Sequence, residues 1–441
     1  MKKNGLSILL ILVIISFSYK YFFYEKKNGN RDHQTVYIKY EDNGGYQLIR
    51  NNSPFIIKGA SGNKNLEELA AIGGNTIRVY DTVNLGDFLD KAHRLNLAVI
   101  VDIPIPRYHK SYNIYQNKEY CSNLKKEVKK LVIRHKDHPA LLLWNLGNEV
   151  EYPFIFGNRD FIDTFNDLIK IIHTEDTNHP VSTTIPSVTK KQVLSIMFNS
   201  PDLDLIGFNI FVAIKRLDKD LDQISLIKKP LPYYISEWGY DGPWATKNTA
   251  WDAPIEQSSN EKTEQLISRY RLLQQKTDNR CLGSLIFYWG SKQERTHTWF
   301  SIFSEEGHPS EMVSTISGLW NDTLSSNPGI NIKQLTIADK ESSESLILKP
   351  GIPEEIALSY TTGLNKIDSV KWELYREGWY YKRWDIEEKP LKIDGSVIIK
   401  DASSAILRTP LKEGPYRLFA YLYSNNCFAT INYPFYVADI K

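Results

Sequence analysis

Two glutamates in this sequence each follow a short apolar segment of the kind that forms buried β-strands. Glu149 comes shortly after the run Leu141–Leu146, and Glu237 comes directly after the run Tyr233–Ser236. Two carboxyl groups about 5–5.5 Å apart can cleave a glycosidic bond, one attacking the anomeric carbon while the other protonates the leaving oxygen. We therefore predict Glu149 as the acid/base and Glu237 as the nucleophile of such a reaction.

Two further polar residues fit the same chemistry. Asn148 precedes the predicted acid/base and can hydrogen-bond a sugar 2-hydroxyl, an interaction that strengthens in the transition state. Arg78 ends the apolar run Asn75–Tyr80 and can keep the nucleophile ionised. Because Glu149 must start protonated, we expect its pKa to be raised relative to that of Glu237.

The elements that must position these residues begin near residue 54, where short apolar runs alternate with segments of helical periodicity. The apolar runs are Phe55–Lys58, Asn75–Tyr80, Ala98–Ile103, Leu141–Leu146, Val181–Thr184, Leu203–Asn209, Tyr233–Ser236 and Leu282–Trp289. The helical segments include Asn65–Ile72, Phe88–Leu95, Cys121–His135, Phe161–His173 and Thr263–Gln275. The piece between Ile210 and Tyr233 is assigned as helical only by default.

Eight strands separated by helices predict an α/β fold of the (β/α)8 TIM barrel type. A doubly wound open sheet would also alternate, but it usually carries a Gly-rich phosphate loop after its first strand, and residues 58–63 lack the GxGxxG spacing. In a barrel the C-terminal strand ends form the active-site face. The fourth and seventh runs would therefore bring Glu149 and Glu237 to one mouth.

Beyond Asn327 the pattern changes to short alternating runs separated by Gly, Pro, Asn and Asp. These runs are Ser345–Leu348, Glu355–Tyr360, Val370–Tyr375, Ser396–Ile399 and Tyr416–Tyr423. They predict a small all-β, immunoglobulin-like sandwich. We accordingly divide the chain into a leader at 1–30, a catalytic barrel at 42–326 and a β-sandwich accessory domain at 327–441.

The N-terminus has the features of an export signal. Lys2 and Lys3 precede the apolar run Leu6–Phe17, which is followed by a Tyr- and Phe-rich segment. The run is short for a membrane-spanning helix, although interfacial aromatics can extend it. A cleaved signal peptide and an uncleaved membrane anchor both fit, and either predicts an exported protein of the cell envelope.

Composition excludes several other classes of protein. The formal net charge of +2 gives no reason to expect a nucleic-acid partner. Three scattered cysteines and nine histidines form neither a disulfide framework nor a metal-ligand motif. We expect neither a metal nor a cofactor, and a carbohydrate as the substrate.

The segments NTIRVY, WNLGNEV and ISEWG resemble those of the clan of retaining glycoside hydrolases whose acid/base and nucleophile follow strands four and seven. The barrel most resembles that of glycoside hydrolase family 2. The stretch Cys281–Glu294, with Thr298–Phe300, is similar to bacterial proteins that join a family-2-like barrel to a trailing β-domain. The resemblance covers about residues 46–437.

This resemblance implies further roles and shows two departures. It implies that Trp289 forms the stacking floor of the sugar site. The usual family 2 enzyme has β-domains before its barrel, and this sequence shows none. Many relatives place a tyrosine after strand six to hydrogen-bond the nucleophile, but here that place is taken by Phe211. The change either slows turnover or leaves another tyrosine, such as Tyr240 or Tyr288, to supply the hydroxyl. From their positions near strand ends we add four binding candidates: Tyr80, Trp238, Gln293 and Glu294.

Three functions remain open at this point. The first is a retaining β-glycosidase acting on a β-linked, β-glucan-like polysaccharide or oligosaccharide. The second is a β-glucan transglycosylase that passes the same covalent intermediate to a sugar, since the chain also resembles β-1,3-glucan transferases. The third is a carbohydrate-binding protein without catalysis, which the presence of both glutamates disfavours.

Overall fold

The structure is a computed structural model of the 441-residue chain. It describes residues 35–439 except 42–43, 109–112, 155–157, 229–230, 276–278, 325–328, 364–365 and 378–388. The predicted leader at 1–30 lies outside the described residues, as does most of the predicted domain boundary. Among the described residues, no helix combines the length and the apolar character needed to cross a bilayer.

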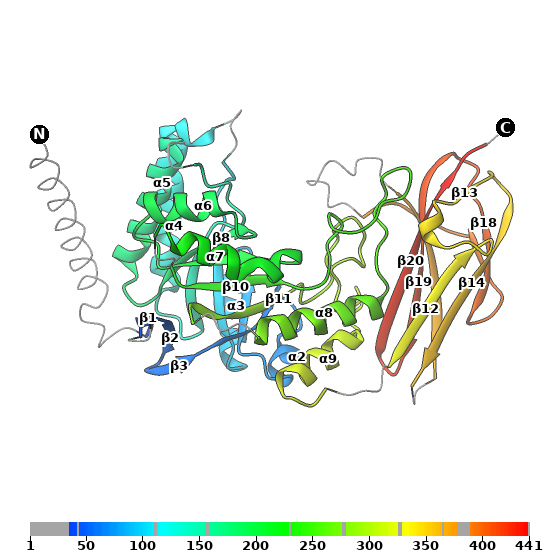
Figure 1. The fold of residues 1–441 in the computed structure, drawn as a ribbon, viewed down its shortest axis with the longest axis horizontal. Coiled ribbons are helices and arrows are strands. Elements are labelled where there is room, and N and C mark those ends of the chain that lie inside the picture. Colours follow the sequence, from blue (N-terminus) through cyan, green and yellow to red (C-terminus); the bar gives the residue numbers. More distant parts are fainter. Residues whose placement is uncertain are drawn as a thin grey trace, which may run out of the picture.

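Eight parallel strands close into a barrel in simple chain order (Figure 1). They are β4 (Ile57–Ser61), β5 (Thr76–Val79), β6 (Ala98–Ile103), β7 (Leu141–Leu146), β8 (Val181–Pro186), β9 (Leu205–Asn209), β10 (Tyr233–Trp238) and β11 (Cys281–Phe287). All eight overlap the apolar runs of the sequence, because a strand buried on both faces must be apolar along its length. The predicted (β/α)8 fold is confirmed.

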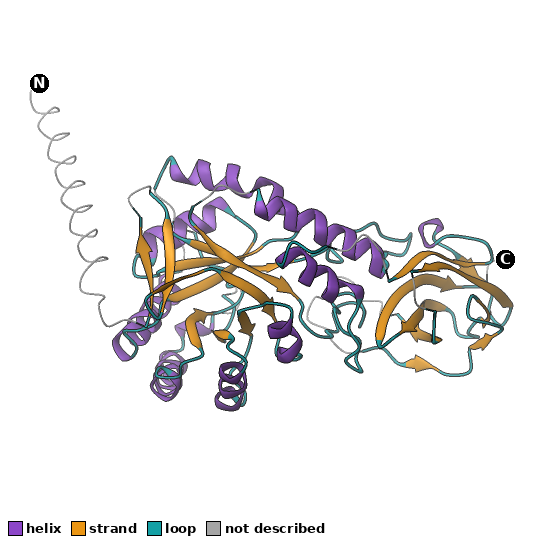
Figure 2. Ribbon diagram, turned by 90° about the horizontal axis from the view of Figure 1, so that it is seen from below, coloured by secondary structure: helices purple, strands orange, loops and turns teal. Residues whose placement is uncertain are grey.

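Helices connect the strands and cover the outside of the barrel (Figure 2). They are α2 (Leu66–Ala71), α3 (Leu85–Arg94), α4 (Lys118–His135), α5 (Arg159–Glu175), α6 (Lys190–Asn199), α7 (Leu217–Ser225), α8 (Ser259–Gln274) and α9 (Glu311–Trp320), with 3-10 turns at Ile114–Gln116, Val212–Arg216 and Ser342–Glu344. The segment assigned as helical by default contains α7, and α6 and α9 are additional to the helical segments named from the sequence.

A small antiparallel sheet lies at the N-terminal end of the barrel. Its strands are β1 (Val36–Tyr40), β2 (Tyr46–Arg50) and β3 (Ser53–Phe55). Val36 and Leu48 from this sheet join the apolar cluster inside the barrel, where Tyr234 of β10 is also buried. This sheet therefore closes the end of the barrel opposite the predicted site. The sequence analysis did not predict it, since short strands of mixed polarity carry little periodic signal.

Two antiparallel sheets form the C-terminal sandwich. One contains β12 (Ile330–Ile337), β14 (Pro353–Thr362), β18 (Ser404–Arg408) and β17 (Val397–Ile399). The other contains β13 (Ile347–Leu348), β20 (Cys427–Val437), β19 (Gly414–Ser424), β15 (Ser369–Arg376) and β16 (Lys392–Ile393). Their inner faces share one apolar cluster separate from that of the barrel. The predicted sandwich is confirmed, with four strands beyond the predicted runs at β12, β16, β18 and β20.

The barrel and the sandwich meet through a buried polar network. Glu256, in the loop between β10 and α8, pairs with Lys262 at 2.6 Å, and both are almost fully buried. The other carboxylate oxygen of Glu256 accepts a hydrogen bond of 2.6 Å from Asn432 of β20. Arg417 of β19 donates to Asn432 and to the backbone oxygen of Pro254. The loop that follows the predicted nucleophile is thus held by the sandwich.

Candidate active site

Glu237 lies near the C-terminal end of β10 and is 5% exposed. Its Oε1 accepts hydrogen bonds from Arg78 Nη1 at 3.0 Å and from the Tyr80 hydroxyl at 2.8 Å. The pairing of β10 with β9 shifts register between Ile235 and Glu237. Such irregularities redirect side chains at barrel rims. Glu237 follows this register shift, and its side chain points to the polar mouth.

Arg78 links the nucleophile to a second buried carboxylate. Its Nε and Nη2 donate to both oxygens of Asp102 on β6, at 2.9 and 2.7 Å. Burial disfavours the charge of Arg78, yet Asp102, and to a smaller extent Glu237, hold its pKa well above the ordinary value. A bidentate pair of this kind fixes both position and charge. Arg78 therefore acts on Glu237 as a permanently charged, rigid donor.

The surroundings of Glu237 act on its charge in opposite directions. Burial raises the pKa of Glu237 to about 7, and the negative charge of Glu149 adds to this rise. Arg78 and the hydrogen bond from Tyr80 oppose it. The sequence analysis did not anticipate this rise at Glu237, which follows from the depth at which the carboxylate is buried. The effect of Glu149 also shows that the two carboxylates lie close enough to interact.

Glu149 lies beyond the end of β7, and its side chain is 30% exposed. Its backbone adopts φ 49°, in the left-handed region that side chains rarely occupy. Asn209 donates a hydrogen bond of 2.9 Å to Oε1, and Arg107 lies 3.6 Å from Oε2. Asn209 thus fixes the carboxyl group through Oε1, and Oε2 is the oxygen nearer to the exposed Arg107.

Asn148 is fixed through its side-chain oxygen. This oxygen accepts hydrogen bonds from Arg78 at 2.8 Å, from Thr184 at 3.0 Å and from Asn209 at 3.3 Å. The amide NH2 group is therefore the end of the side chain that can face a ligand. A donor in a set orientation beside the nucleophile is what binding of a sugar 2-hydroxyl requires.

Both tryptophans predicted to bind sugar are buried. Trp238 is 1% exposed and stacks on Tyr270 of α8, with ring centroids 5.9 Å apart. Trp289 is 0% exposed, packs against Phe303 and donates its indole N–H to the backbone oxygen of Asn65. Both rings fill the barrel wall, so neither presents a face to a sugar in this structure.

The remaining binding candidates, Gln293 and Glu294, follow β11. Glu294 pairs with Lys292 at 2.6 Å, and the side-chain oxygen of Gln293 is buried without a hydrogen-bond partner among the described residues. Lys292 also lies near enough to Glu237 to lower its pKa. This segment therefore approaches the nucleophile through Lys292, which the sequence analysis did not single out.

The nucleophile receives its tyrosine from an unexpected strand. The sequence suggested Tyr240 and Tyr288 as examples of a tyrosine that could replace the hydroxyl missing at Phe211, but Tyr80, at the end of β5, donates the hydrogen bond. The guanidinium of Arg78 lies 4.6 Å from the Tyr80 ring centroid, which holds the ring in place. Phe211 instead packs among aromatic rings, with Phe287 at 5.9 Å.

Sequence reasoning missed the roles of Asn209 and Thr184. Asn209 ends β9 and is 4% exposed, and its own oxygen accepts a hydrogen bond from Ser236. Thr184, on β8, donates to Asn148. Their one signal in the sequence was a polar residue at the C-terminal end of an apolar run, which is the rule that had located Glu149 and Glu237.

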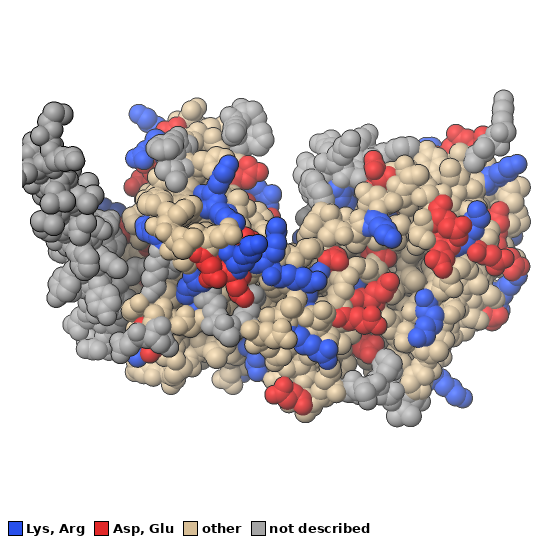
Figure 3. Space-filling model, viewed as in Figure 1, with Lys and Arg blue, Asp and Glu red and all other residues tan. Residues whose placement is uncertain are grey.

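The surface is hollowed between the part of the barrel that carries α6 and α7 and the sandwich (Figure 3). The N-terminal end of α8 contacts the sandwich through Asn260, which donates to the backbone of Ile330. The sandwich is therefore attached at the end of the barrel where the strands point and the two glutamates lie.

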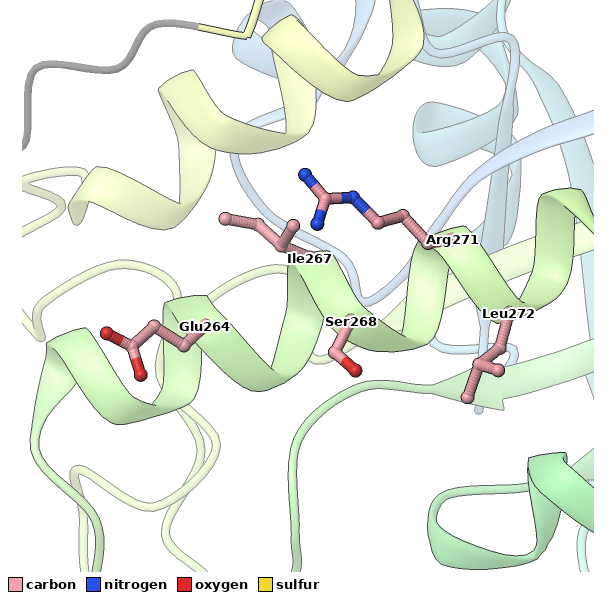
Figure 4. A pocket seen from close by; sticks show the side chains of 5 residues that line it. All are labelled: Glu264, Ile267, Ser268, Arg271 and Leu272. Atoms are coloured by element: carbon pink, nitrogen blue, oxygen red, sulfur yellow. The ribbon is translucent and has the colours of Figure 1, made fainter.

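A separate hollow of about 490 Å³ lies on the outside of the barrel. Its lining residues all belong to α8, and Figure 4 shows their side chains along that helix: Glu264, Ile267, Ser268, Arg271 and Leu272. None of them belongs to a strand that carries the glutamates, so we do not place the substrate there. Within the part of the chain that the structure describes, no group of three or more His, Cys, Asp or Glu side chains has a metal-binding arrangement.

The fold and the polar mouth define a (β/α)8 barrel with a glycosidase-type pair of carboxylates. The family model "Glycosyl hydrolases family 2, TIM barrel domain" matches residues 88–322, and the chain belongs to this family of glycoside hydrolases. No curated protein matches the sequence.

Solved structures share the fold at low sequence identity. The chain is similar to a family 2 β-galacturonidase from Eisenbergiella tayi, with 16% identity and a TM-score of 0.53 over 65% of this chain and 54% of that one. It is also similar to the β-glucuronidase of Ruminococcus gnavus, with 16% identity and a TM-score of 0.51 over 65% and 52%. The chain spans about half the length of the solved structures that it matches.

Proposed function

We propose that this protein is a retaining β-glycosidase that works by double displacement. The Glu237 carboxylate attacks the anomeric carbon while Glu149 gives its proton to the leaving oxygen. Glu149 then takes a proton from water, whose oxygen attacks the anomeric carbon and releases Glu237. The observation that carries the proposal is Glu237 held by Arg78 and Tyr80, facing Glu149 across one mouth.

We propose a neutral β-linked saccharide of β-glucan type as the substrate. Three cations described at the mouth are each paired with a carboxylate of the protein. Arg78 pairs with Asp102, Arg107 with Glu149 and Lys292 with Glu294. A uronic acid would have to compete for one of these cations, at a cost in desolvation and lost pairing. The similar solved structures are named as a glucuronidase and a galacturonidase, so the test includes their sugars.

The decisive experiment traps the intermediate. Aryl 2-deoxy-2-fluoro-β-glucoside, -glucuronide and -galacturonide are incubated with the enzyme, and the labelled peptide is located by mass spectrometry. We expect the fluoroglucoside to label Glu237. With an unfluorinated aryl β-glucoside, proton NMR of the first product should show the β-anomer. An initial α-anomer would refute retention. Labelling only by the uronides would refute the neutral sugar. Sizing products over time separates hydrolysis from the transglycosylase alternative, in which longer chains accumulate.

We also propose that the protein is exported and that residues 1–30 serve only targeting. A chain beginning at residue 31 should fold and retain activity, because the first described strand is β1, which starts at Val36. Fractionation of cells that express the full chain should place it in the envelope or the medium. Recovery of the full chain in the cytosolic fraction would contradict export.

A further inference from the structure

One exposed tryptophan lies at the mouth of the barrel. Trp244, in the loop between β10 and α8, is 49% exposed. Its ring is 5.5 Å from the Phe211 ring in an edge-on arrangement and 6.0 Å from that of Phe300. Phe211 in turn packs on Phe287, and Phe287 on Tyr80, whose hydroxyl contacts the nucleophile. A continuous series of aromatic rings therefore leads from the catalytic carboxylate to a half-exposed indole.

Backbone geometry orients this indole. The residues Gly242-Pro243-Trp244-Ala245 form a turn closed by the Ala245 N–H donating to the Gly242 oxygen at 2.9 Å. Gly242 lies against the indole, since a Cβ at this position would come within 2.3 Å of its six-membered ring. Proline at the second position of a turn fixes its φ angle. Trp244 is thus held before any ligand arrives, which reduces the entropy lost on binding.

The base of the loop is also fixed. The Trp299 indole donates to the Asp241 backbone oxygen at 3.0 Å, and Arg269 forms an ion pair with the Asp241 carboxylate. Farther along the loop, Arg417 of the sandwich holds Pro254. An apolar ring of this size exposed on a rigid loop at a catalytic mouth is characteristic of a binding surface.

We propose that Trp244 is the stacking platform of a second sugar subsite, at which the C–H face of a pyranose ring lies on the indole. The inference rests on the proposed glycosidase function and extends it. Because the rings of Phe287 and Phe211 lie between Tyr80 and Trp244, the sugar on Trp244 is a different unit from the one attacked. The substrate is therefore an oligosaccharide or polysaccharide that binds across at least two units.

The test compares chain lengths. KM and kcat are measured for β-1,3- and β-1,4-gluco-oligosaccharides of increasing length, and for an aryl β-glucoside, with wild type and Trp244→Ala. We expect KM for the long substrates to rise about tenfold, which corresponds to about 1.4 kcal/mol, and the rise to be smallest for the aryl glucoside. Gly242→Ala should have a similar effect by displacing the ring, whereas Lys247→Ala, exposed on the same loop, should match wild type.

Binding is measured separately so that the two proposals can fail independently. Calorimetry with cellohexaose and laminarihexaose uses Glu237→Gln, alone and combined with Trp244→Ala. We expect at least one hexasaccharide to bind, with affinity about tenfold lower when Trp244 is removed. Equal affinities, no binding of either hexasaccharide, or a KM rise equal at all lengths would overturn the subsite. Turnover by Glu237→Gln would overturn the assignment of Glu237 as the nucleophile. The subsite at Trp244 would then be judged from the binding affinities alone.

Discussion

The Tyr80 hydroxyl donates a 2.8 Å hydrogen bond to Oε1 of Glu237, from a strand that lies three places away around the barrel. The same oxygen accepts from Arg78 at 3.0 Å. Both donors stabilise the ionised carboxylate, which burial disfavours. The fraction of Glu237 that is ionised at neutral pH therefore depends on these two donors.

Replacing Tyr80 with Phe should move the acidic limb of kcat/KM to higher pH. Glu237 attacks only when ionised, so activity falls as pH drops through its pKa of about 7. Loss of the donor raises that pKa further. Rate profiles between pH 4 and 9 would show this shift, with the basic limb unchanged. Tyr46→Phe, in the sheet at the opposite end of the barrel, is the control. An unmoved acidic limb would mean that Tyr80 does not tune the nucleophile.

Glu149→Ala should reduce the rate by an amount that depends on the leaving group of the substrate. General acid catalysis contributes about 10²–10⁴-fold, so natural glycosides should lose about that much. Aryl glycosides with good leaving groups need little protonation and should lose far less at glycosylation. Added azide should restore part of the rate through the vacated space. Glu151→Ala, an exposed neighbour, provides the control. Equal losses on both substrate types without azide rescue would contradict the acid/base role.

Glu237→Gln should stabilise the folded protein at alkaline pH while it abolishes turnover. The folded pKa of about 7 exceeds the ordinary value of 4.5, so the proton on Glu237 stabilises the fold below about pH 4.5, and this contribution disappears as pH rises through 7. Glutamine stays neutral at every pH. At pH 8 the variant should gain about 3 kcal/mol.

Denaturant unfolding at pH 8 and pH 5 measures this difference. The advantage of Glu237→Gln should shrink at pH 5, where the wild-type carboxyl is protonated in the folded protein. A wild type more stable than the variant at pH 8 would show that the ion pair with Arg78 outweighs the burial of the charge.

Lys262→Met should lower the free energy of unfolding, because Lys262 lies in the buried polar network between barrel and sandwich. It leaves the Glu256 carboxylate buried without its cation, a change that costs about 3–5 kcal/mol. Adding Glu256→Gln should recover part of the loss, because the amide removes the unpaired charge. Chemical unfolding of wild type and the single and double variants forms the test. A double variant no more stable than Lys262→Met would argue that packing, not the buried charge, dominates here.

Much of the barrel could be predicted from residue order alone. The runs Ala98–Ile103 and Leu141–Leu146 coincide with β6 and β7 because barrel strands are buried on both faces and must be apolar throughout. Strand direction then brings Glu149 and Glu237 to one end without any knowledge of contacts. The position of a residue relative to its strand is a local property, which can be predicted from the neighbouring residues in the sequence.

Side-chain partners could not be predicted in this way. Trp238 follows the nucleophile in the chain, yet it faces α8, whereas Tyr80, far away in sequence, contacts Glu237. A register shift in β10 and the closure of the barrel decide both outcomes. Trp289 likewise lies at a strand end, but its indole N–H donates a hydrogen bond to the backbone of Asn65 within the barrel wall. The sequence by itself determined the barrel, its mouth and the two carboxylates. Only the tertiary structure decided which groups touch them, because contacts across a closed barrel depend on register and curvature that arise when all eight strands pack together.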